Sequence, residues 1–219
     1  MATYPAVPPR PAGRLEVIAG PMFSGKSEEL MRRVRRATIA GVNVLVVSHA
    51  LDTRAELTAV TSHNGVNIPA IPVGDVGSLA RTARSEAYDL IAIDEAQFFG
   101  EELIPLVEEL IAQGATVIVE GLCVTFDGGP FEPMPQFMAI AEDVLKLTAV
   151  CTVCGRDAVF HQRLDRTDVE TETTSAEPAS GEPTPAEPAA TDIDASHIGG
   201  LESYAACCRE HFMPGFHTL

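Results

Sequence analysis

The segment Gly20-Pro-Met-Phe-Ser-Gly-Lys-Ser27 decides the fold of this chain. It follows an apolar run, residues 15–19, and precedes residues 28–40, in which apolar side chains recur at helical spacing. Gly20, Gly25 and Lys26 fit the G-x-x-x-x-G-K-[ST] pattern in the strand–loop–helix context of a phosphate-binding loop. A Gly-rich turn that binds nothing is the alternative, but the flanking strand and helix disfavour it. The segment therefore predicts that the chain binds a nucleoside triphosphate.

Each residue type in this loop suits a phosphate ligand. Glycines allow backbone N–H groups to turn toward phosphate oxygens, and the helix N-terminus adds the positive end of its dipole. Lys26 can reach the β- and γ-phosphates, while the Ser27 hydroxyl can coordinate Mg²⁺. The residues expected to contact the nucleotide here are Gly20, Pro21, Met22, Phe23, Ser24, Gly25, Lys26 and Ser27.

Short apolar segments alternate with helix-like segments through the first 120 residues. The apolar segments are rich in β-branched residues on both faces, which is typical of buried parallel strands. The expected strands are residues 15–19, 42–47, 90–93 and 115–119. The expected helices are residues 28–40, 76–87 and 101–113, with Gly41 and Gly114 at C-caps. This alternation predicts a RecA-like α/β fold, with a parallel sheet and crossover helices around the phosphate loop.

The pattern changes after Gly121. We expect an irregular loop over residues 123–135, a helix over 136–144 and a short strand over 145–150. The chain then divides into a flexible leader (1–13), a nucleotide-binding domain (14–144) and a smaller C-terminal domain (145–219). Within the last, residues 166–195 are acidic, Pro-rich and without aromatics, so they cannot bury enough apolar area to offset the entropy of ordering. This insert is expected to be disordered.

The chain is strongly acidic, with a net charge of −16 and only two lysines. That composition argues against a nucleic-acid partner, which needs clustered Lys and Arg. No apolar run approaches the roughly 20 residues that cross a bilayer, and the leader lacks the apolar core of a signal peptide. The five cysteines are then better interpreted as thiols or metal ligands than as disulfides. We expect a cytoplasmic protein without a membrane partner.

Two adjacent acids, Asp94 and Glu95, follow the expected strand at residues 90–93. A carboxylate at this place holds Mg²⁺ in phosphate-loop enzymes, which suits Asp94. Glu95 can then act as a general base on water or on a substrate hydroxyl, or simply orient it. A solvated turn after a buried strand is the alternative, and the phosphate loop makes it less favoured.

The two motifs leave the phosphoryl acceptor open. If Glu95 activates water, the chain is an NTPase or a helicase-like motor, and Asp94-Glu-Ala-Gln97 does look like a helicase box. If Glu95 activates a small-molecule hydroxyl, the chain is a kinase. A helicase core normally needs a second RecA-like lobe and a basic surface, and this chain has neither the length nor the charge. The kinase is favoured, and a nucleotide-binding regulatory module without turnover is a third possibility.

Four residues form a C-x-x-C … C-x-x-H pattern, namely Cys151, Cys154, Cys208 and His211. Three thiolates and one imidazole can close a tetrahedral Zn²⁺ site with no open position, so the zinc would be structural. It would supply folding energy to the small domain. Cys207 could replace Cys208, but only Cys208 keeps the two-residue spacing to His211. Two unrelated thiol pairs are the alternative, and Cys123 is expected to be a packed thiol.

Together these motifs resemble the tetrameric, zinc-containing thymidine kinases of bacteria and of the animal cytosol. The resemblance rests on residues 20–27, 52–54, 62–64, 94–99, 146–151 and 198–200 with Tyr204. It implies transfer of the γ-phosphoryl group of ATP to the 5′-hydroxyl of thymidine or deoxyuridine, giving dTMP and ADP in nucleotide salvage for DNA synthesis. It also implies Mg²⁺ at the phosphates and a homotetramer.

The resemblance implies roles for individual residues as well. Glu95 falls on the family's catalytic base, and Arg54 on an arginine that neutralises charge on the transferred group, together with Lys26. Further nucleotide contacts are implied for Asp52, Thr53, Asp94 and Gln97. Phe98, Phe126 and Phe131 fall near the thymine ring, and Tyr204 contacts the nucleoside. A loop held at its roots by Zn²⁺ reads the polar edge of the base through the backbone of Ser196, His197, Ile198 and Gly199.

Two positions depart from the family pattern. Members often carry Asp two residues after the strand-ending Gly and Arg after the loop Phe, where this chain has Cys123 and Asp127. The acidic insert also lengthens the substrate-covering loop, and we expect it to bulge outward with both loop ends in register.

Overall fold

The computed structural model describes residues 13–51, 59–61, 67–164 and 203–213. At its centre is a six-stranded sheet in the order β5-β2-β6-β7-β1-β8, in which all neighbours pair in parallel. The strands are β1 (Arg14–Gly20), β2 (Val44–His49), β5 (Ile71–Val73), β6 (Leu90–Ile93), β7 (Thr116–Leu122) and β8 (Asp143–Lys146). The predicted α/β fold with a parallel sheet is confirmed.

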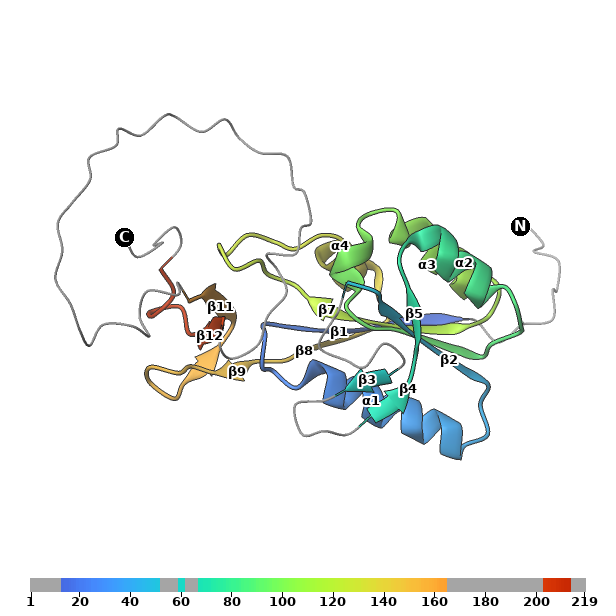
Figure 1. Ribbon diagram of the computed structural model, residues 1–219, viewed down its shortest axis with the longest axis horizontal. Coiled ribbons are helices and arrows are strands. Elements are labelled where there is room, and N and C mark those ends of the chain that lie inside the picture. The colour runs from blue at the N-terminus through green and yellow to red at the C-terminus, as the bar shows by residue number, and fades with distance from the viewer. Residues whose placement is uncertain (1–12, 52–58, 62–66, 165–202, 214–219) are drawn as a thin grey trace, which may run out of the picture.

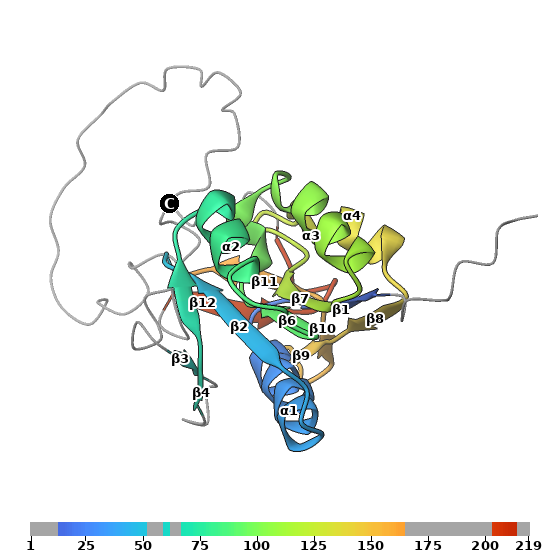
Figure 2. The same ribbon diagram turned by 90° about the vertical axis from the view of Figure 1, so that its right-hand side faces the viewer.

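Helices cover both faces of this sheet (Figures 1 and 2). One face carries α1 (Lys26–Ile39), and the other carries α2 (Val76–Ala83), α3 (Leu103–Ala112) and α4 (Met134–Ile140). Successive strand residues point to opposite faces, so Val117 and Val119 of β7 join the core under α2 to α4, whereas Ile118 joins the core under α1. The sheet is therefore buried on both sides, as its apolar strands predict.

The edges of the sheet differ from the prediction. The helix expected over residues 136–144 is wrong in its extent, because α4 ends at Ile140 and β8 pairs with β1 instead. Alternate residues of β8 are exposed at the edge of the sheet, so the segment lacks the continuous apolar run of a buried strand. β8 also crosses the predicted domain boundary after residue 144. The opposite edge strand, β5, was missed because it has three residues and contains Pro72.

Two short antiparallel pairs form a small C-terminal unit beyond the end of the sheet at which β1 finishes (Figure 1). They are β9 (Ala149–Val150) with β10 (Asp157–Ala158), and β11 (Phe160–Arg163) with β12 (Tyr204–Cys207). The N–H of Leu164 donates to the carbonyl of Ser203 at 2.8 Å, so the described chain leaves and re-enters this unit at one place. A third pair, β3 (Ala59–Thr61) with β4 (Asn67–Pro69), lies near α1.

The described helices are all too short or too polar to cross a membrane. Residues 1–12 of the predicted leader and the whole predicted acidic insert lie outside the described residues.

Candidate active site

The phosphate-binding loop connects the end of β1 at Gly20 to the first residue of α1, Lys26. A Cβ on Gly20 would lie 2.6 Å from Oγ of Ser24 and 2.9 Å from the carbonyl oxygen of Leu147, so this position admits no side chain. Gly25 has φ +82°, the left-handed conformation that glycine adopts without strain. The Ser24 hydroxyl donates to the carbonyl of Pro21 at 2.8 Å. The loop is thus folded back on itself at the N-terminus of a helix, where anions bind.

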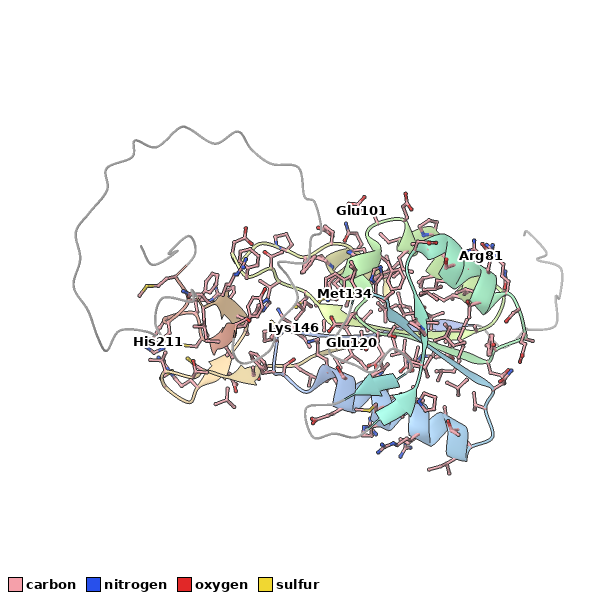
Figure 3. The ribbon with its side chains drawn as sticks, viewed as in Figure 1. Arg81, Glu101, Glu120, Met134, Lys146 and His211 are labelled. Carbon is pink, nitrogen blue, oxygen red and sulfur yellow. The ribbon has the colours of Figure 1, made fainter. Side chains whose placement is uncertain are left out.

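The side chain of Lys26 is buried at the base of this loop. Its Nζ donates to the carbonyl of Pro21 at 3.2 Å and lies 3.7 Å from Oε1 of Glu120. Glu120 belongs to β7 and is fully buried; Figure 3 labels it. It was not among the predicted site residues, although one acid inside the otherwise apolar segment Thr116–Leu122 is a signal that the sequence does contain.

The two predicted acids follow β6 directly. The N–H of Asp94 donates to the carbonyl of Val47 at 2.9 Å, which continues the ladder to β2. Glu95 then adopts a left-handed conformation, φ 51° and ψ 47°, and begins the 3₁₀ helix η1 (Ala96–Phe99). Its N–H donates to Oε2 of Glu120 at 3.3 Å. Lys26 and Glu95 therefore contact opposite oxygens of one carboxylate.

Gln97 joins this turn to the neighbouring strand. Its side chain is fully buried; Nε2 donates to Oε2 of Glu95, and Oε1 accepts from the N–H of Leu122 at 3.0 Å. A Cβ on Gly121 would overlap Oε1 of Gln97 and lie 3.0 Å from Sδ of Met134. The close approach of Gln97 thus requires glycine at position 121. Gln97 was predicted to contact the nucleotide; in the structure it forms a hydrogen bond to the carboxylate of Glu95.

Three of the four aromatic residues predicted to contact the nucleoside lie together. Tyr204 and Phe131 are buried in one cluster with Met22 of the phosphate loop and Leu122, and the half-buried Phe126 packs against it. The fourth, Phe98, packs near His49, with ring centroids 5.8 Å apart. This places aromatic side chains from two distant parts of the sequence, residues 126–131 and Tyr204, beside the phosphate loop.

The remaining predicted contacts lie outside the described residues. They are Asp52, Thr53 and Arg54 of the nucleotide site, and Ser196, His197, Ile198 and Gly199 of the substrate loop. Their roles stay predictions.

The predicted metal ligands converge in the C-terminal unit. One ligand atom from each of four residues lies within 4.8 Å of all the others, and the residues are Cys151, Cys154, Cys208 and His211. The Sγ atoms of Cys154 and Cys208 are 3.7 Å apart, and Nδ1 of His211 lies 3.2 Å from Sγ of Cys208. Tetrahedral Zn–S bonds of about 2.3 Å would hold two sulfurs about 3.8 Å apart, so these donors fit zinc.

The two adjacent cysteines are distinguished by this geometry. Cys208 is in the cluster, whereas the thiol of Cys207 donates to the carbonyl of Ala205. Within the cluster, backbone N–H groups, above all that of Cys208, lower the pKa of Cys151 to about 6. A lowered pKa favours the thiolate, which is the form that binds a metal. The four residues can therefore hold a structural zinc ion.

The small C-terminal unit contacts both loops of the candidate site. The half-buried Phe23 of the phosphate loop packs against the cluster that contains Cys151 and Cys208. Phe212, next to His211, stacks on Phe160 with centroids 4.4 Å apart. A Cβ on Gly128 would lie 2.6 Å from the Phe212 ring, so this ring packs closely on the loop that carries Phe126. A metal ion bound by the four residues would stabilise these contacts.

Comparison with known proteins identifies the family to which the chain belongs. A family model described as thymidine kinase matches residues 13–212. The chain belongs to the thymidine kinase family. It is 46% identical to the thymidine kinase of Deinococcus deserti over 212 residues, covering 93% of this chain and 96% of that one. It is 44% identical to the thymidine kinase of Coprothermobacter proteolyticus, covering 93% and 92%.

Membership of the thymidine kinase family confirms the resemblance seen in the motifs and makes the chain a kinase rather than a helicase-like motor. A third relative, the thymidine kinase of Deinococcus radiodurans, is 47% identical over 165 residues, covering 71% of this chain and 78% of that one. Among solved structures, AMPPCP-bound DnaA from Aquifex aeolicus has a TM-score of 0.35 and 13% identity, covering 61% of this chain and 40% of that one. That similarity is too distant to bear on function.

Proposed function

We propose that this protein transfers the γ-phosphoryl group of ATP to the 5′-hydroxyl of thymidine, giving dTMP and ADP. One observation carries the proposal: the phosphate-loop Lys26 and the Glu95 turn contact the same buried carboxylate of Glu120. A phosphate-holding cation and a base are thereby kept at one end of the sheet, where α/β folds bind their ligands.

The backbone of the phosphate loop and Lys26 would hold the phosphates, with the α1 N-terminus supplying positive potential. Ser27 and the buried Asp94 offer the hard oxygen ligands that Mg²⁺ prefers, and the ion would neutralise charge on the β- and γ-phosphates. Glu95 would take the proton of the 5′-hydroxyl as its oxygen attacks the γ-phosphorus. Arg54, with Lys26, would neutralise charge on the transferred group.

The aromatic residues would hold the base. Phe126, Phe131 and Tyr204 lie beside the phosphate loop, and we place the thymine ring against them and Phe98. The backbone of residues 196–199 would read its polar edge. Deoxyuridine lacks only the methyl group of thymine, and one such group in an apolar pocket is worth roughly 1–3 kcal/mol. We therefore expect deoxyuridine to be phosphorylated with a lower kcat/KM.

The wider role follows from the same chemistry. Production of dTMP from thymidine fits nucleotide salvage for DNA synthesis. A cytoplasmic location is proposed from the sequence, in which the five cysteines are better interpreted as thiols or metal ligands than as a disulfide framework. We also propose a homotetramer, a structural zinc at the Cys3His cluster, and neither nucleic-acid nor membrane partners.

A coupled assay of ATP consumption tests the proposal. The purified protein with ATP and Mg²⁺ is given each of the four deoxynucleosides, deoxyuridine, DNA or RNA in turn, and products are separated chromatographically. We expect thymidine to stimulate ADP release with an equal amount of dTMP formed. Stimulation by DNA or RNA alone would indicate a nucleic-acid remodeller, and nucleotide binding with no product would indicate a regulatory module.

A further inference from the structure

We infer that Glu120 is a positioning residue for phosphoryl transfer, acting through Lys26 and Glu95. The inference rests on the proposed function, because both partners have roles in that reaction. The Glu120 side chain is fully buried in the middle of the fold. Its Oε1 lies 3.7 Å from Nζ of Lys26, and its Oε2 accepts from the N–H of Glu95 at 3.3 Å. One carboxylate oxygen of Glu120 therefore contacts Lys26, and the other contacts Glu95.

The sheet places this side chain between its partners. Glu120 follows Val119, whose neighbour on β6 is Ile93, so Glu120 is level with the turn of Asp94 and Glu95. On its other side it pairs with Ile18 of β1, two residues before Gly20 and the phosphate loop. Alternation along β7 directs it to the same face as Ile118, which is the face covered by α1. The N-terminus of that helix is Lys26.

Stability alone does not account for an acid at this position. Removing a carboxylate from water is costly, and a buried ion pair is often no more stabilising than apolar residues of similar volume. Ile118 precedes Glu120 on the same face of β7, and Ile18 is its pairing partner on β1. Both are apolar and buried. An apolar residue would therefore continue the core, whereas a carboxylate can hold the ammonium group and the Glu95 turn together.

The two contacts have separate consequences for the reaction. The charge of Glu120 holds the buried ammonium of Lys26 beneath the loop, where it also donates to the carbonyl of Pro21. The bond from the Glu95 N–H fixes a left-handed backbone conformation that non-glycine residues seldom adopt. That conformation sets the direction in which the Glu95 carboxylate leaves the turn. Loss of Glu120 should consequently disturb the transfer step more than nucleoside binding.

Three variants of the full-length protein separate these effects. Glu120→Gln removes the charge beside Lys26 but keeps a carbonyl that can accept from the N–H of Glu95. Glu120→Met removes both the charge and the hydrogen-bond acceptor. Glu16→Gln is the matched control, because Glu16 lies on the adjacent β1 and pairs with Arg33, away from the site. Steady-state kinetics with thymidine and ATP, the melting temperature and the bound zinc are measured for each.

We expect kcat to fall at least tenfold in Glu120→Gln and further in Glu120→Met, with the KM for thymidine within threefold of wild type. The melting temperature should not follow that order, and Glu16→Gln should keep the wild-type kcat. The inference is overturned by a kcat within twofold of wild type in Glu120→Gln, or by a loss of kcat, nucleoside binding and zinc together. A wild-type protein that makes no dTMP would instead remove the proposed function itself.

Discussion

Nε2 of Gln97 donates a hydrogen bond to the carboxylate of Glu95, two residues before it. The same amide accepts from the N–H of Leu122 on β7, so the orientation of the Glu95 side chain is tied to the backbone of the neighbouring strand. The Gln97 side chain that makes these two hydrogen bonds is fully buried, and breaking them would leave polar groups without partners in the interior. The carboxylate is therefore held in place by the main sheet rather than by a surface loop.

Glu95→Gln should fold and bind ATP but lose about 10²-fold or more in kcat, because general-base catalysis contributes roughly 10²–10⁴-fold. ATP affinity is measured by calorimetry and turnover by the coupled assay. Glu101→Gln, on an exposed turn before α3, is the matched control and should behave as wild type. Turnover near the wild-type rate in Glu95→Gln would contradict the role assigned to this residue.

Gly121→Ala should destabilise the protein by about 1–3 kcal/mol, the usual cost of overpacking, and should also lower kcat. The added Cβ would overlap the Gln97 amide that holds Glu95. Gly74→Ala is the control, because a Cβ there would meet no atom within 4 Å. Urea denaturation and kcat are compared for the two variants. Equal stability and equal turnover in both would show that the Gln97 contact is not tight.

Cys208→Ser should lose the bound zinc, whereas Cys207→Ser should keep it. Only the first thiol lies in the ligand cluster, although the two residues are adjacent and both buried. Zinc per chain is measured by atomic absorption, before and after treatment with a chelator. Because the unit contacts the loop of Phe126, zinc loss should raise the KM for thymidine more than that for ATP. Zinc retained by Cys208→Ser but lost by Cys207→Ser would reverse the ligand assignment.

The pH dependence of stability should contain a contribution from His49. Burial lowers the pKa of His49, and Asp75 and Glu95 only partly oppose it. A histidine with a lowered folded-state pKa stabilises the fold above its unfolded pKa of about 6.5, and that stability is lost as the pH falls. The difference in melting temperature between wild type and His49→Gln should therefore shrink between about pH 7.5 and 5.5. A difference that stays constant would show that His49 does not titrate in this range.

Deletion of residues 168–192 should preserve most of the activity. The flanking residues Leu164 and Ser203 are joined by a backbone hydrogen bond, so shortening the connection does not require either end to move. Loop-closure entropy depends only on the logarithm of loop length, and the change amounts to about 1 kcal/mol. The value of kcat/KM for thymidine is measured. A collapse of that value would show that the deleted residues take part in substrate binding.

Much of the fold could be predicted because buried parallel strands are continuous apolar runs. β1, β2, β6 and β7 are such runs, and each was placed from its composition. The two edge strands, β5 and β8, are short and partly exposed, so their pattern does not differ from that of a loop or a helix end. Their positions depend on pairing with β2 and β1, which is a tertiary interaction.

The site was predictable where function depends on local spacing. The phosphate loop is contiguous and lies between β1 and α1, and the cysteine pattern consists of two short motifs, C-x-x-C and C-x-x-H, whose four ligand atoms lie close together. Glu120 was missed because its role depends on two partners that are 94 and 25 residues away in the sequence. A single acid in an apolar strand indicates that something pairs with it, but the identity of the partner comes only from the register of the sheet.

The buried position of Tyr204 against Met22 and Leu122 has a consequence for biosynthesis. A ribosome releases the sheet and the phosphate loop first, but the aromatic cluster cannot close until Tyr204 has also emerged. At about 5–20 residues per second, the residues between Leu164 and Ser203 delay that moment by roughly 2–8 seconds. During this interval the nascent chain carries a phosphate loop whose Met22 is not yet covered by Tyr204, so the aromatic cluster is completed only after the parallel sheet has left the ribosome.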